Sequence, residues 1–402
     1  MDTVTDERRA WVFDPLSAEF NADPYPHYHR LRSEDPVHFV DVPGMWLLSR
    51  YTDVVTALLD RRLSAERFQL SLPEMQASAL ISSLSRMMLL RDPPRHTRLR
   101  SLASKAFTPR TVEQLRPRIH RIVDELIDAI AAIGGMDLIR DIAEPLPVVV
   151  IAELMGLPAG DRAQLKRWSD ALVTVADGSL ALAGFAAAEQ SAAEFKEYLA
   201  RIFAQRRIEP QDDLISALLA AREHDDRLDD DELFASCVLL LIAGHETTTN
   251  LIGNGIVTLL RHPEELARLR DDPSLIRSAV EELLRFESPV QLTSRVAAVD
   301  HDIDGRTIRK GQEVCLLLAA ANRDPAQFVD PDRLDLGRAD NEHLAFGHGL
   351  HFCLGAALAR LEGQIAIQAV LRRLPGLRLA SDTLAWREGL MLRGLKELAL
   401  VW

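Results

Sequence analysis

The sequence predicts a mainly α protein with small β-sheets, folded as a single domain over residues 1–402. Three observations carry this prediction. Several long segments have helix start and stop signals, only three short regions have the pattern of strands, and no Gly/Ser linker or internal repeat divides the chain. Apolar residues make up 47% of the chain and charged residues 27%, a balance that excludes wholesale disorder.

The helices are recognised first by their ends. Asp92 is expected to cap a helix that begins at Pro93, because proline lacks the amide hydrogen that a first helical turn leaves unpaired. Asp272-Pro273 repeats this signal for a helix that should stop before Ser288-Pro289. The alanine-rich segment 171–193 predicts two packed helices with a break at residues 177–179, or else a mobile lid over a pocket.

Strands are expected in three places. Residues 37–49 predict a hairpin around Pro43-Gly44, and residues 299–308 predict another around Gly305, followed by a strand at 313–318. The last residues, from 390 onwards, can add short strands. The sheets are therefore expected to be a minor part of a helical protein.

Charge and targeting signals exclude several classes of protein. The net charge of −13 should repel nucleic acid and acidic membranes. The first residues have no apolar core of a secretory signal, and no apolar run approaches the ~20 residues that span a bilayer. The three cysteines form no close pair, which fits a reduced cytoplasm and argues against a disulfide scaffold or a zinc site. We expect a soluble cytoplasmic protein.

A long helix carries the first chemical motif. Asp229 and Glu232 have capping-box spacing, and their helix can run about 45 Å to Arg261. Its middle, residues 243–249 (AGHETTT), follows an apolar stretch, although a glycine and a carboxylate destabilise a buried helix. Threonine hydroxyls can bond carbonyls one turn back, and glycine admits close approach of a ligand. The motif predicts a polar notch that faces a ligand, with an exposed polar stripe as the alternative.

Cys353 is expected at the N-terminus of the last helix, after the loop FGHGLHFCLG at 346–355. The helix dipole and free amides favour a thiolate there. Such a thiolate can be a nucleophile, with His348 or His351 as base, or a metal ligand. Zinc would need more ligands than the loop offers, whereas a single thiolate suits an iron held by a macrocycle. The residues alone leave these possibilities open, together with a merely structural cysteine.

Two charged patterns are less specific. Glu282 and Arg285 are three residues apart on one helix, as many solvated ion pairs are. Residues 86–121 contain ten lysines and arginines against two acidic residues, and His96 and Arg100 share a helix face there. This segment is either a solvated basic face, or it holds the carboxylates of a ligand and docks an acidic protein.

Together these features resemble the cytochrome P450 family, the haem-thiolate monooxygenases. The cysteine loop matches the family pattern F-x-x-G-x-x-x-C-x-G at each fixed position, AGHETT at 243–248 resembles the oxygen-activation motif, and EELLR at 281–285 contains its E-x-x-R. Residues 331–334 (PDRL) resemble the segment whose arginine joins that pair. Matching segments run from Asp23 to Leu395, and the cysteine loop is the most specific of them.

The resemblance implies a helical prism with small β-sheets, in which haem b lies between the long central helix and the cysteine loop. Cys353 is implied to be the axial thiolate ligand of the iron. The other residues implied around the haem are Phe346, Gly349, Gly355 and Ala243, with His96, Arg100, Arg295 and His351 as partners of the propionates. Glu282, Arg285 and Arg333 are implied to form a structural network, and His348 has no implied role.

Glu246 and Thr247 match the acid–alcohol pair that delivers protons in this family, and Gly244 would leave room for oxygen or substrate. Peroxide-driven members tend to lack the pair, so the resemblance favours reduction by NAD(P)H. The alternatives are a peroxide-driven or non-catalytic haem-binding member of the fold. A thiol hydrolase that uses Cys353 would leave both E-x-x-R and AGHETT unexplained.

Partners and substrate follow from the same resemblance. Because the chain has no flavin or iron–sulfur motif, electrons are expected from a separate ferredoxin and ferredoxin reductase, with the ferredoxin on Arg98, Lys105 and Arg110. The segments implied to contact substrate are rich in Leu, Met, Ala, Ser and Val, and lie at 64–90, 171–193, 238–247, 290–293 and 390–392. They predict a bulky apolar substrate, such as a polyketide or macrolide, terpenoid, steroid or fatty acid, which the enzyme would hydroxylate or epoxidise. The protein is expected to be a monomer.

Overall fold

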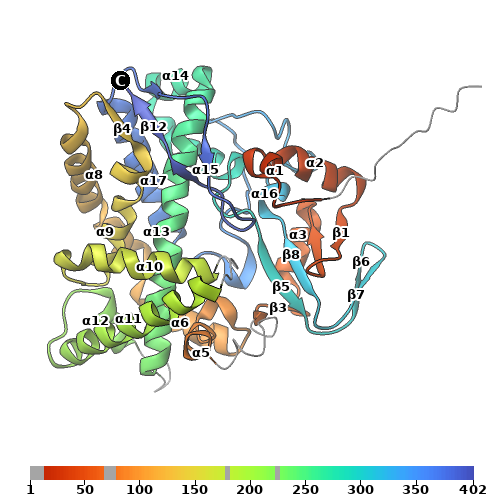
Figure 1. The fold of residues 1–402 in the computed structure, drawn as a ribbon, viewed down its shortest axis with the longest axis horizontal. Helices are drawn as coiled ribbons and strands as arrows, with labels where there is room; N and C mark the ends of the chain where they lie inside the picture. Colours follow the sequence, from red (N-terminus) through yellow and green to blue (C-terminus); the bar gives the residue numbers. More distant parts are fainter. Residues whose placement is uncertain (1–12, 68–77, 177–181, 222–226) are drawn as a thin grey trace, which may run out of the picture.

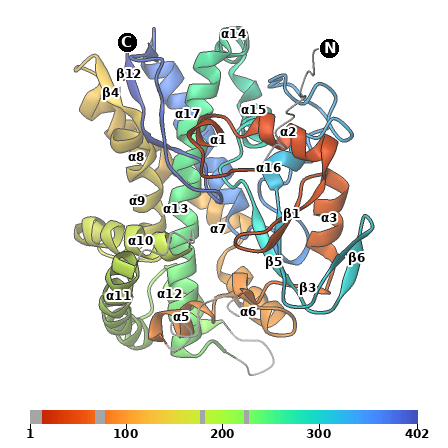
Figure 2. The ribbon, with the colours of Figure 1, turned by 45° about the vertical axis from the view of Figure 1, so that its right-hand side comes forward.

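Helix α13 (Asp230–Arg261) crosses the molecule from one end to the other (Figures 1 and 2). The carboxylate of Asp229 accepts a hydrogen bond from the Glu232 amide, and the carboxylate of Glu232 accepts one from the Asp229 amide. This reciprocal cap satisfies two amides that the first turn leaves unpaired. The predicted start and end of the long helix are both confirmed.

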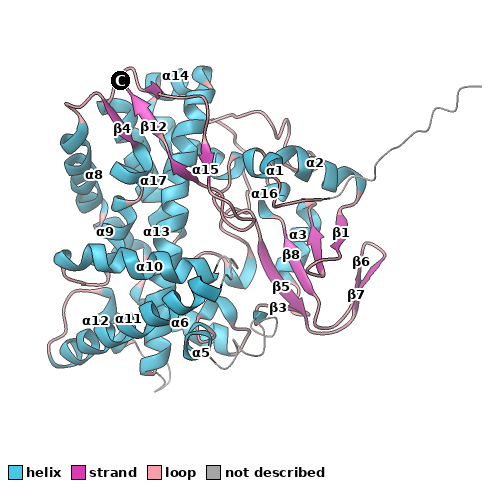
Figure 3. Cartoon of the chain, viewed as in Figure 1, coloured by secondary structure: helices cyan, strands magenta, loops and turns pink. Residues whose placement is uncertain are grey.

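The computed structural model describes residues 13–67, 78–176, 182–221 and 227–402. Most of them are helical (Figure 3). The other α-helices are α1 (Ala18–Ala22), α2 (Tyr25–Glu34), α3 (Tyr51–Leu59), α5 (Ala79–Leu84), α6 (Arg95–Ala106), α7 (Pro109–Gln114), α8 (Arg116–Ile130), α9 (Pro145–Leu154), α10 (Arg162–Ala176), α11 (Leu182–Ile208), α12 (Leu214–Ala220), α14 (Pro263–Asp271), α15 (Ile276–Phe286), α16 (Leu318–Ala321) and α17 (Ala356–Arg373). Short helical turns are η2 (Met88–Leu90), η3 (Ile139–Ala143), η4 (Ala159–Asp161), η5 (Pro273–Leu275) and η6 (Gly349–His351).

The strands of the described residues form four small sheets, the largest of them on the side of the molecule away from α8 to α12 (Figure 1). Its order is β1 (Val37–Val40), β2 (Met45–Leu48), β8 (Glu313–Leu316), β5 (Thr293–Ala297) and β3 (Leu63–Ser64). The others pair β6 (His301–Ile303) with β7 (Arg306–Ile308), β10 (Ala385–Trp386) with β11 (Leu395–Glu397), and β12 (Ala399–Val401) with both β4 (Gly135–Asp137) and β9 (Arg378–Leu379). Both predicted hairpins are confirmed, and Gly305 turns the second with a φ of 73°.

Two predicted helix starts differ in detail. The carboxylate of Asp92 does not cap α6, because it accepts hydrogen bonds from the Ala65 amide at 2.9 Å and the Ser64 hydroxyl at 2.5 Å. The helix therefore begins at Arg95 rather than at Pro93. Asp272 caps the short turn η5, and α15 ends before Ser288-Pro289 as expected. The predicted alanine-rich helices are α10 and α11, and their break lies outside the described residues.

A buried ion pair within α15 also bonds the chain that leads to the cysteine loop. The Arg285 guanidinium donates two hydrogen bonds of 2.8 Å to the Glu282 carboxylate, and both side chains are fully buried. Arg285 also donates to the carbonyl oxygens of Asn322 and Pro331. A solvated helix-surface pair is therefore excluded, and the pair fixes the chain that leads to the cysteine loop.

The third side chain of this network is Arg338, and the prediction of Arg333 is wrong. The Arg338 guanidinium contacts both oxygens of Glu282 at 3.2 Å. Arg333 is exposed and contributes only its backbone carbonyl, which accepts from Arg285 at 3.4 Å. The guanidinium that reaches Glu282 therefore comes from the arginine five residues further along the chain.

Candidate active site

One stripe of α13 is left uncovered by protein. Leu240, Ala243, Gly244 and Thr247 are exposed or half-exposed, although most residues of the helix from Leu233 to Leu259 are buried. Their spacing places them on one helix face. We call these four residues the accessible stripe. The predicted notch in an otherwise buried helix is confirmed in part: Gly244 and Thr247 lie in it, whereas Glu246, Thr248 and Thr249 are buried.

Threonine hydroxyls bond back to the helix at this stripe, as predicted. The Thr247 hydroxyl donates to the Ala243 carbonyl at 2.9 Å, and the Thr248 hydroxyl donates to the Gly244 carbonyl at 3.1 Å. Because each hydroxyl donates its hydrogen to the helix, the oxygen of Thr247 keeps its lone pairs for a group at the stripe. A Cβ on Gly244 would lie 3.7 Å from Ile151, so helix α9 shares the space beside this glycine.

The cysteine loop folds back on itself ahead of α17. The Cys353 amide donates to the Phe346 carbonyl at 2.9 Å, and Gly347 and Gly349 turn the chain with φ values of 72° and 70°. A Cβ on Gly349 would lie 2.9 Å from the Leu59 side chain, so a larger residue would collide with α3. Gly355 is the N-cap of α17, and Cys353 is exposed beside it.

Burial raises the pKa of the Cys353 thiol, although its side chain is accessible to solvent. Hydrogen bonds from the Gly355 and Ala356 amides and the charges of Arg100 and Arg360 lower the pKa, but they do not outweigh burial. The helix end alone therefore does not secure the predicted thiolate, and a bound metal cation would do so. Among the described residues, the groups that act on the sulfur are backbone amides and arginines, and none is a histidine.

Basic side chains converge around His351, and we call them the cation cluster: Arg67, His96, Arg100, Arg295 and His351. Arg100 connects the cluster to Cys353. The rings of His96 and His351 lie 4.2 Å apart, and the Arg100 guanidinium donates to the Phe352 carbonyl at 2.6 Å. Four of these residues were predicted from the sequence. Arg67 was missed, and it joins them by donating to the Ser294 hydroxyl at 3.3 Å.

The cation cluster has the electrostatics of an anion site. Burial and neighbouring positive charges lower the pKa of Arg295 to about 10 and that of His351 to about 3. The Nδ1 atom of His96 is buried without a hydrogen-bond partner. Groups that repel one another and leave a polar atom unpaired are stabilised by a bound anion. The donor set suits the two carboxylates of a haem.

Glu281 clamps the loop from α15. Its carboxylate accepts from Arg360 at 2.7 Å and lies 3.1 Å from the His343 ring. The Arg360 guanidinium also lies over the Phe346 ring, 4.5 Å from its centroid. The sequence did not single out this clamp, because its members lie 62 and 79 residues apart.

The clamp predicts a pH-dependent stability. Burial raises the pKa of Glu281, but the hydrogen bonds from His343 and Arg360 outweigh it and hold the pKa at about 2. Since an unfolded glutamate has a pKa of about 4.3, this contribution is complete above about pH 5 and is lost as the pH falls towards 2. The stability deficit of Glu281→Gln against the wild type should therefore shrink from pH 5 downwards in urea unfolding. An equal deficit at pH 7 and pH 3 would contradict this, and exposed Glu264→Gln is the control.

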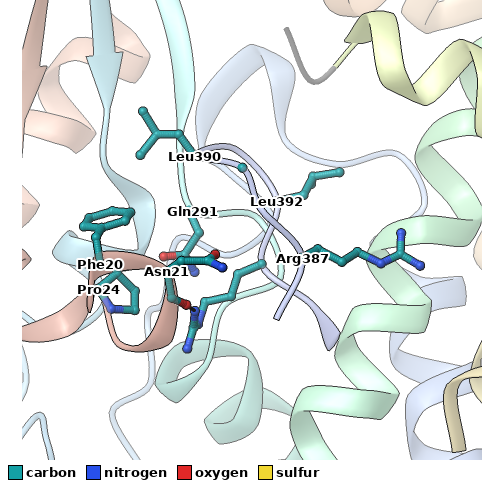
Figure 4. A pocket seen from close by; sticks show the side chains of 9 residues that line it. Phe20, Asn21, Pro24, Gln291, Arg387, Leu390 and Leu392 are labelled. Carbon is teal, nitrogen blue, oxygen red and sulfur yellow. Dashed lines mark hydrogen bonds between the residues drawn. The ribbon is translucent and has the colours of Figure 1, made fainter. Parts of the chain in front are cut away.

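Glu246 lies off the accessible stripe. The Glu246 side chain is buried, and its carboxylate forms an ion pair with the Arg387 guanidinium. Figure 4 shows the Arg387 side chain directed towards α13. Nearby residues of the C-terminal segment, Leu390 and Leu392, line a cavity of about 10 Å³, the size of one water molecule. The sequence did not predict a cation for Glu246, because Arg387 lies 141 residues away.

Several basic residues of the segment 86–121 form ion pairs within the protein. Arg98 donates to Glu232 at 2.7 Å, Arg116 to Glu113 at 2.5 Å, and Arg118 to Glu153 at 2.6 Å. These pairs weaken the prediction that Arg98 docks a protein partner.

None of the helices in the described parts of the chain is both long and apolar enough to cross a membrane.

Comparisons with known proteins place the chain in one family. The family model for cytochrome P450 matches residues 183–375. The polyketide biosynthesis cytochrome P450 PksS of Bacillus subtilis (strain 168) is 41% identical over 96% of this chain and 98% of its own length. The vitamin D(3) 25-hydroxylase of Pseudonocardia autotrophica is 46% identical over 96% and 95%.

Solved structures agree with the curated relatives. The crystal structure of P450BioI in complex with an acyl carrier protein that carries hexadec-9Z-enoic acid has a TM-score of 0.91, with 43% identity. The likeness covers 96% of this chain and 99% of that one. The mainly helical fold with small sheets is therefore confirmed. The chain belongs to the cytochrome P450 family, the monooxygenases that hold haem through a cysteine thiolate.

Proposed function

We propose that this protein inserts one oxygen atom from O2, by hydroxylation or epoxidation, into a bulky apolar small molecule. Haem b would lie between the accessible stripe of α13 and the cysteine loop. The observation that carries the proposal is the cation cluster, which leaves His96 Nδ1 unpaired and whose Arg100 interacts with an accessible Cys353. A hydrolase has no need of such a buried anion site.

The residues present fit the cofactor. Cys353 would hold the haem iron through its sulfur, and the cation cluster would bond the two propionates. Phe346, Gly349, Gly355 and Ala243 would line the ring, where small side chains allow close approach. Bound there, the haem would supply the activation of O2 by two electrons.

Proton delivery would be the task of Thr247 and Glu246. The Thr247 oxygen has lone pairs at the stripe, and Glu246 lies one residue away with its carboxylate on Arg387. A carboxylate that turns between this ion pair and the stripe would carry protons to the hydroxyl. Gly244 would leave the backbone open beside them.

Thr247→Ala tests this role. We expect the variant to bind substrate but to divert reducing equivalents from product to hydrogen peroxide, because the hydroxyl that guides protons is lost. The measurement is hydrogen peroxide released per NADPH oxidised. Thr248→Ala is the matched control, since Thr248 makes the same bond one turn back but is buried off the stripe. Unchanged coupling in Thr247→Ala would remove Thr247 from this role.

The substrate class is inferred from lining residues and relatives. Leu390, Leu392 and the half-exposed Leu240 offer apolar surface, whereas residues 68–77 of the expected substrate segment 64–90 lie outside the described residues. The names of two relatives refer to polyketide biosynthesis and vitamin D(3), and the P450BioI structure holds a fatty acyl chain. A spectral binding screen of macrolides, sterols, terpenoids and fatty acids, free and carrier-bound, tests the class.

The electron donor is proposed to be a ferredoxin, reduced by its reductase, that docks on Lys105 and Arg110. Reversing both charges should slow reduction roughly tenfold at low ionic strength, because attraction between opposite charges speeds association. The same change should flatten the salt dependence of the rate, which stopped-flow reduction measures. Lys310→Glu, on the turn after β7, is the control. If both variants behave like the wild type, the docking surface lies elsewhere.

A further inference from the structure

His245 has no part in the function proposed above, although it lies in the same motif as Glu246. Its side chain is buried, at 2% exposure, in the middle of α13. It contacts α10 rather than the accessible stripe, because its Nδ1 atom lies 3.1 Å from the hydroxyl of Ser169. A titratable ring in a helix core has a cost in stability, so its contacts are informative.

The other ring nitrogen lies between two carboxylates. His245 Nε2 is 3.9 Å from Asp170 Oδ1 and 4.0 Å from Glu246 Oε2. The Asp170 side chain is 47% exposed and that of Glu246 is 9% exposed. One water molecule, or a shift of about 1 Å in a side chain, would complete a hydrogen bond across each gap. The ring thus bridges a carboxylate in solvent and a carboxylate in the core.

The surroundings of Nδ1 permit the ring to gain and lose a proton. The Ser169 hydroxyl can donate to Nδ1, and the Leu241 carbonyl, 3.3 Å away, can accept from it. Nδ1 is therefore satisfied with or without its hydrogen. Nδ1 therefore keeps a hydrogen-bond partner whether or not Nε2 carries a proton. The free-energy cost of an unpaired buried atom does not restrict the ring to one protonation state.

The two carboxylates that face the ring are themselves bonded to cations. Lys166 bonds the Asp170 carboxylate at 2.8 Å and is shared with Glu144 at 2.9 Å, and Arg387 pairs with Glu246. Three carboxylates thus surround two cations, so a proton on His245 adds the positive charge that balances them. A proton on His245 would be stabilised by the two carboxylates that face it.

We propose that His245 relays protons from solvent at Asp170 to Glu246, and that Arg387 holds the Glu246 carboxylate in position to receive them. A proton from bulk water, guided by Asp170, adds to the neutral ring at Nε2. The imidazolium then gives that proton to Glu246 Oε2 and returns to the neutral form, and no electron moves. His245 acts through Glu246, so the inference rests on the proton-delivery role proposed for Glu246.

The first test is independent of catalysis. Histidine resonances of the full chain are titrated by NMR, and the His245 signal is assigned by its loss in His245→Gln. Asp170→Asn and Glu246→Gln should each lower the titration midpoint of His245, because each removes a facing negative charge. A midpoint that responds to neither substitution would overturn the proposal. Asp170 is half-exposed, so its variant should fold.

The second test uses the haem-loaded enzyme with a ferredoxin and its reductase, and testosterone as the probe. NADPH oxidation should fall about tenfold or more in His245→Gln, with a larger solvent deuterium effect and an altered pH profile, because proton transfer becomes limiting. Asp170→Asn should act in the same direction. His262→Gln is the control, since His262 also bonds a carbonyl one turn back but packs on Phe286.

The outcomes separate the two claims. If Glu246→Gln leaves the rate and the deuterium effect unchanged, the proton-delivery role of Glu246 fails, and the relay fails with it. If Glu246→Gln slows turnover while His245→Gln and Asp170→Asn do not, the relay alone is rejected. Slowing in all three variants, with a normal His262→Gln, supports the relay.

Discussion

Replacing Arg285 with alanine is expected to lower the free energy of unfolding by about 3–5 kcal/mol, because it leaves the fully buried carboxylate of Glu282 without its main partner. Glu282→Ala should cost as much, since it leaves the guanidinium uncompensated. Equilibrium unfolding in urea measures both. A variant that does not fold has lost more free energy of unfolding than predicted, and this result would have the predicted direction.

Surface pairs provide the contrast. Arg373 bonds Asp124 at 3.1 Å with partly exposed side chains, so Arg373→Ala should cost about 0–1 kcal/mol. The network further predicts that Arg338→Ala is much more destabilising than Arg333→Ala, which should stay within about 0.5 kcal/mol of the wild type. If Arg285→Ala were as mild as Arg373→Ala, the buried pair would not be holding the loop.

Replacing Cys353 with serine is expected to abolish NADPH-driven oxygenation. A hydroxyl cannot provide the electron density that a thiolate gives to iron, so product formation should fall to background even where haem is retained. Product yield per haem, measured with the best binder from the spectral screen, checks this.

The other two cysteines are matched controls. Cys237 and Cys315 are buried, and burial raises the pKa of each thiol far above its usual value, so neither favours a thiolate. Cys237→Ala and Cys315→Ala should therefore keep the activity. Oxygenation that survives in Cys353→Ser but is lost in Cys315→Ala would show that Cys353 is not the iron ligand.

Features set by local spacing were predicted well. The capping box placed the start of α13, because a cap acts within a few residues. Gly347 and Gly349 of the cysteine loop have the positive φ values that their turns require. The accessible stripe also followed from local pattern, since polar residues in an apolar helix need a reason to be there.

Features that depend on distant pairing were not predicted. Arg387 reaches Glu246 and Arg67 joins the cation cluster through tertiary contacts, which no spacing along the chain encodes. Arg338 replaced Arg333 because the path of a loop decides which arginine meets Glu282. Asp92 bonds Ser64 and Ala65 instead of a helix end, because a nearby strand competed for its carboxylate.

The absorbance spectrum of the reduced, carbon-monoxide-bound protein tests the central claim most directly. Thiolate ligation by Cys353 predicts the long-wavelength Soret band that this ligand gives, in the wild type and in Cys315→Ala but not in Cys353→Ser. Folded protein that takes up no haem, or a thiolate band that persists in Cys353→Ser, would contradict the account.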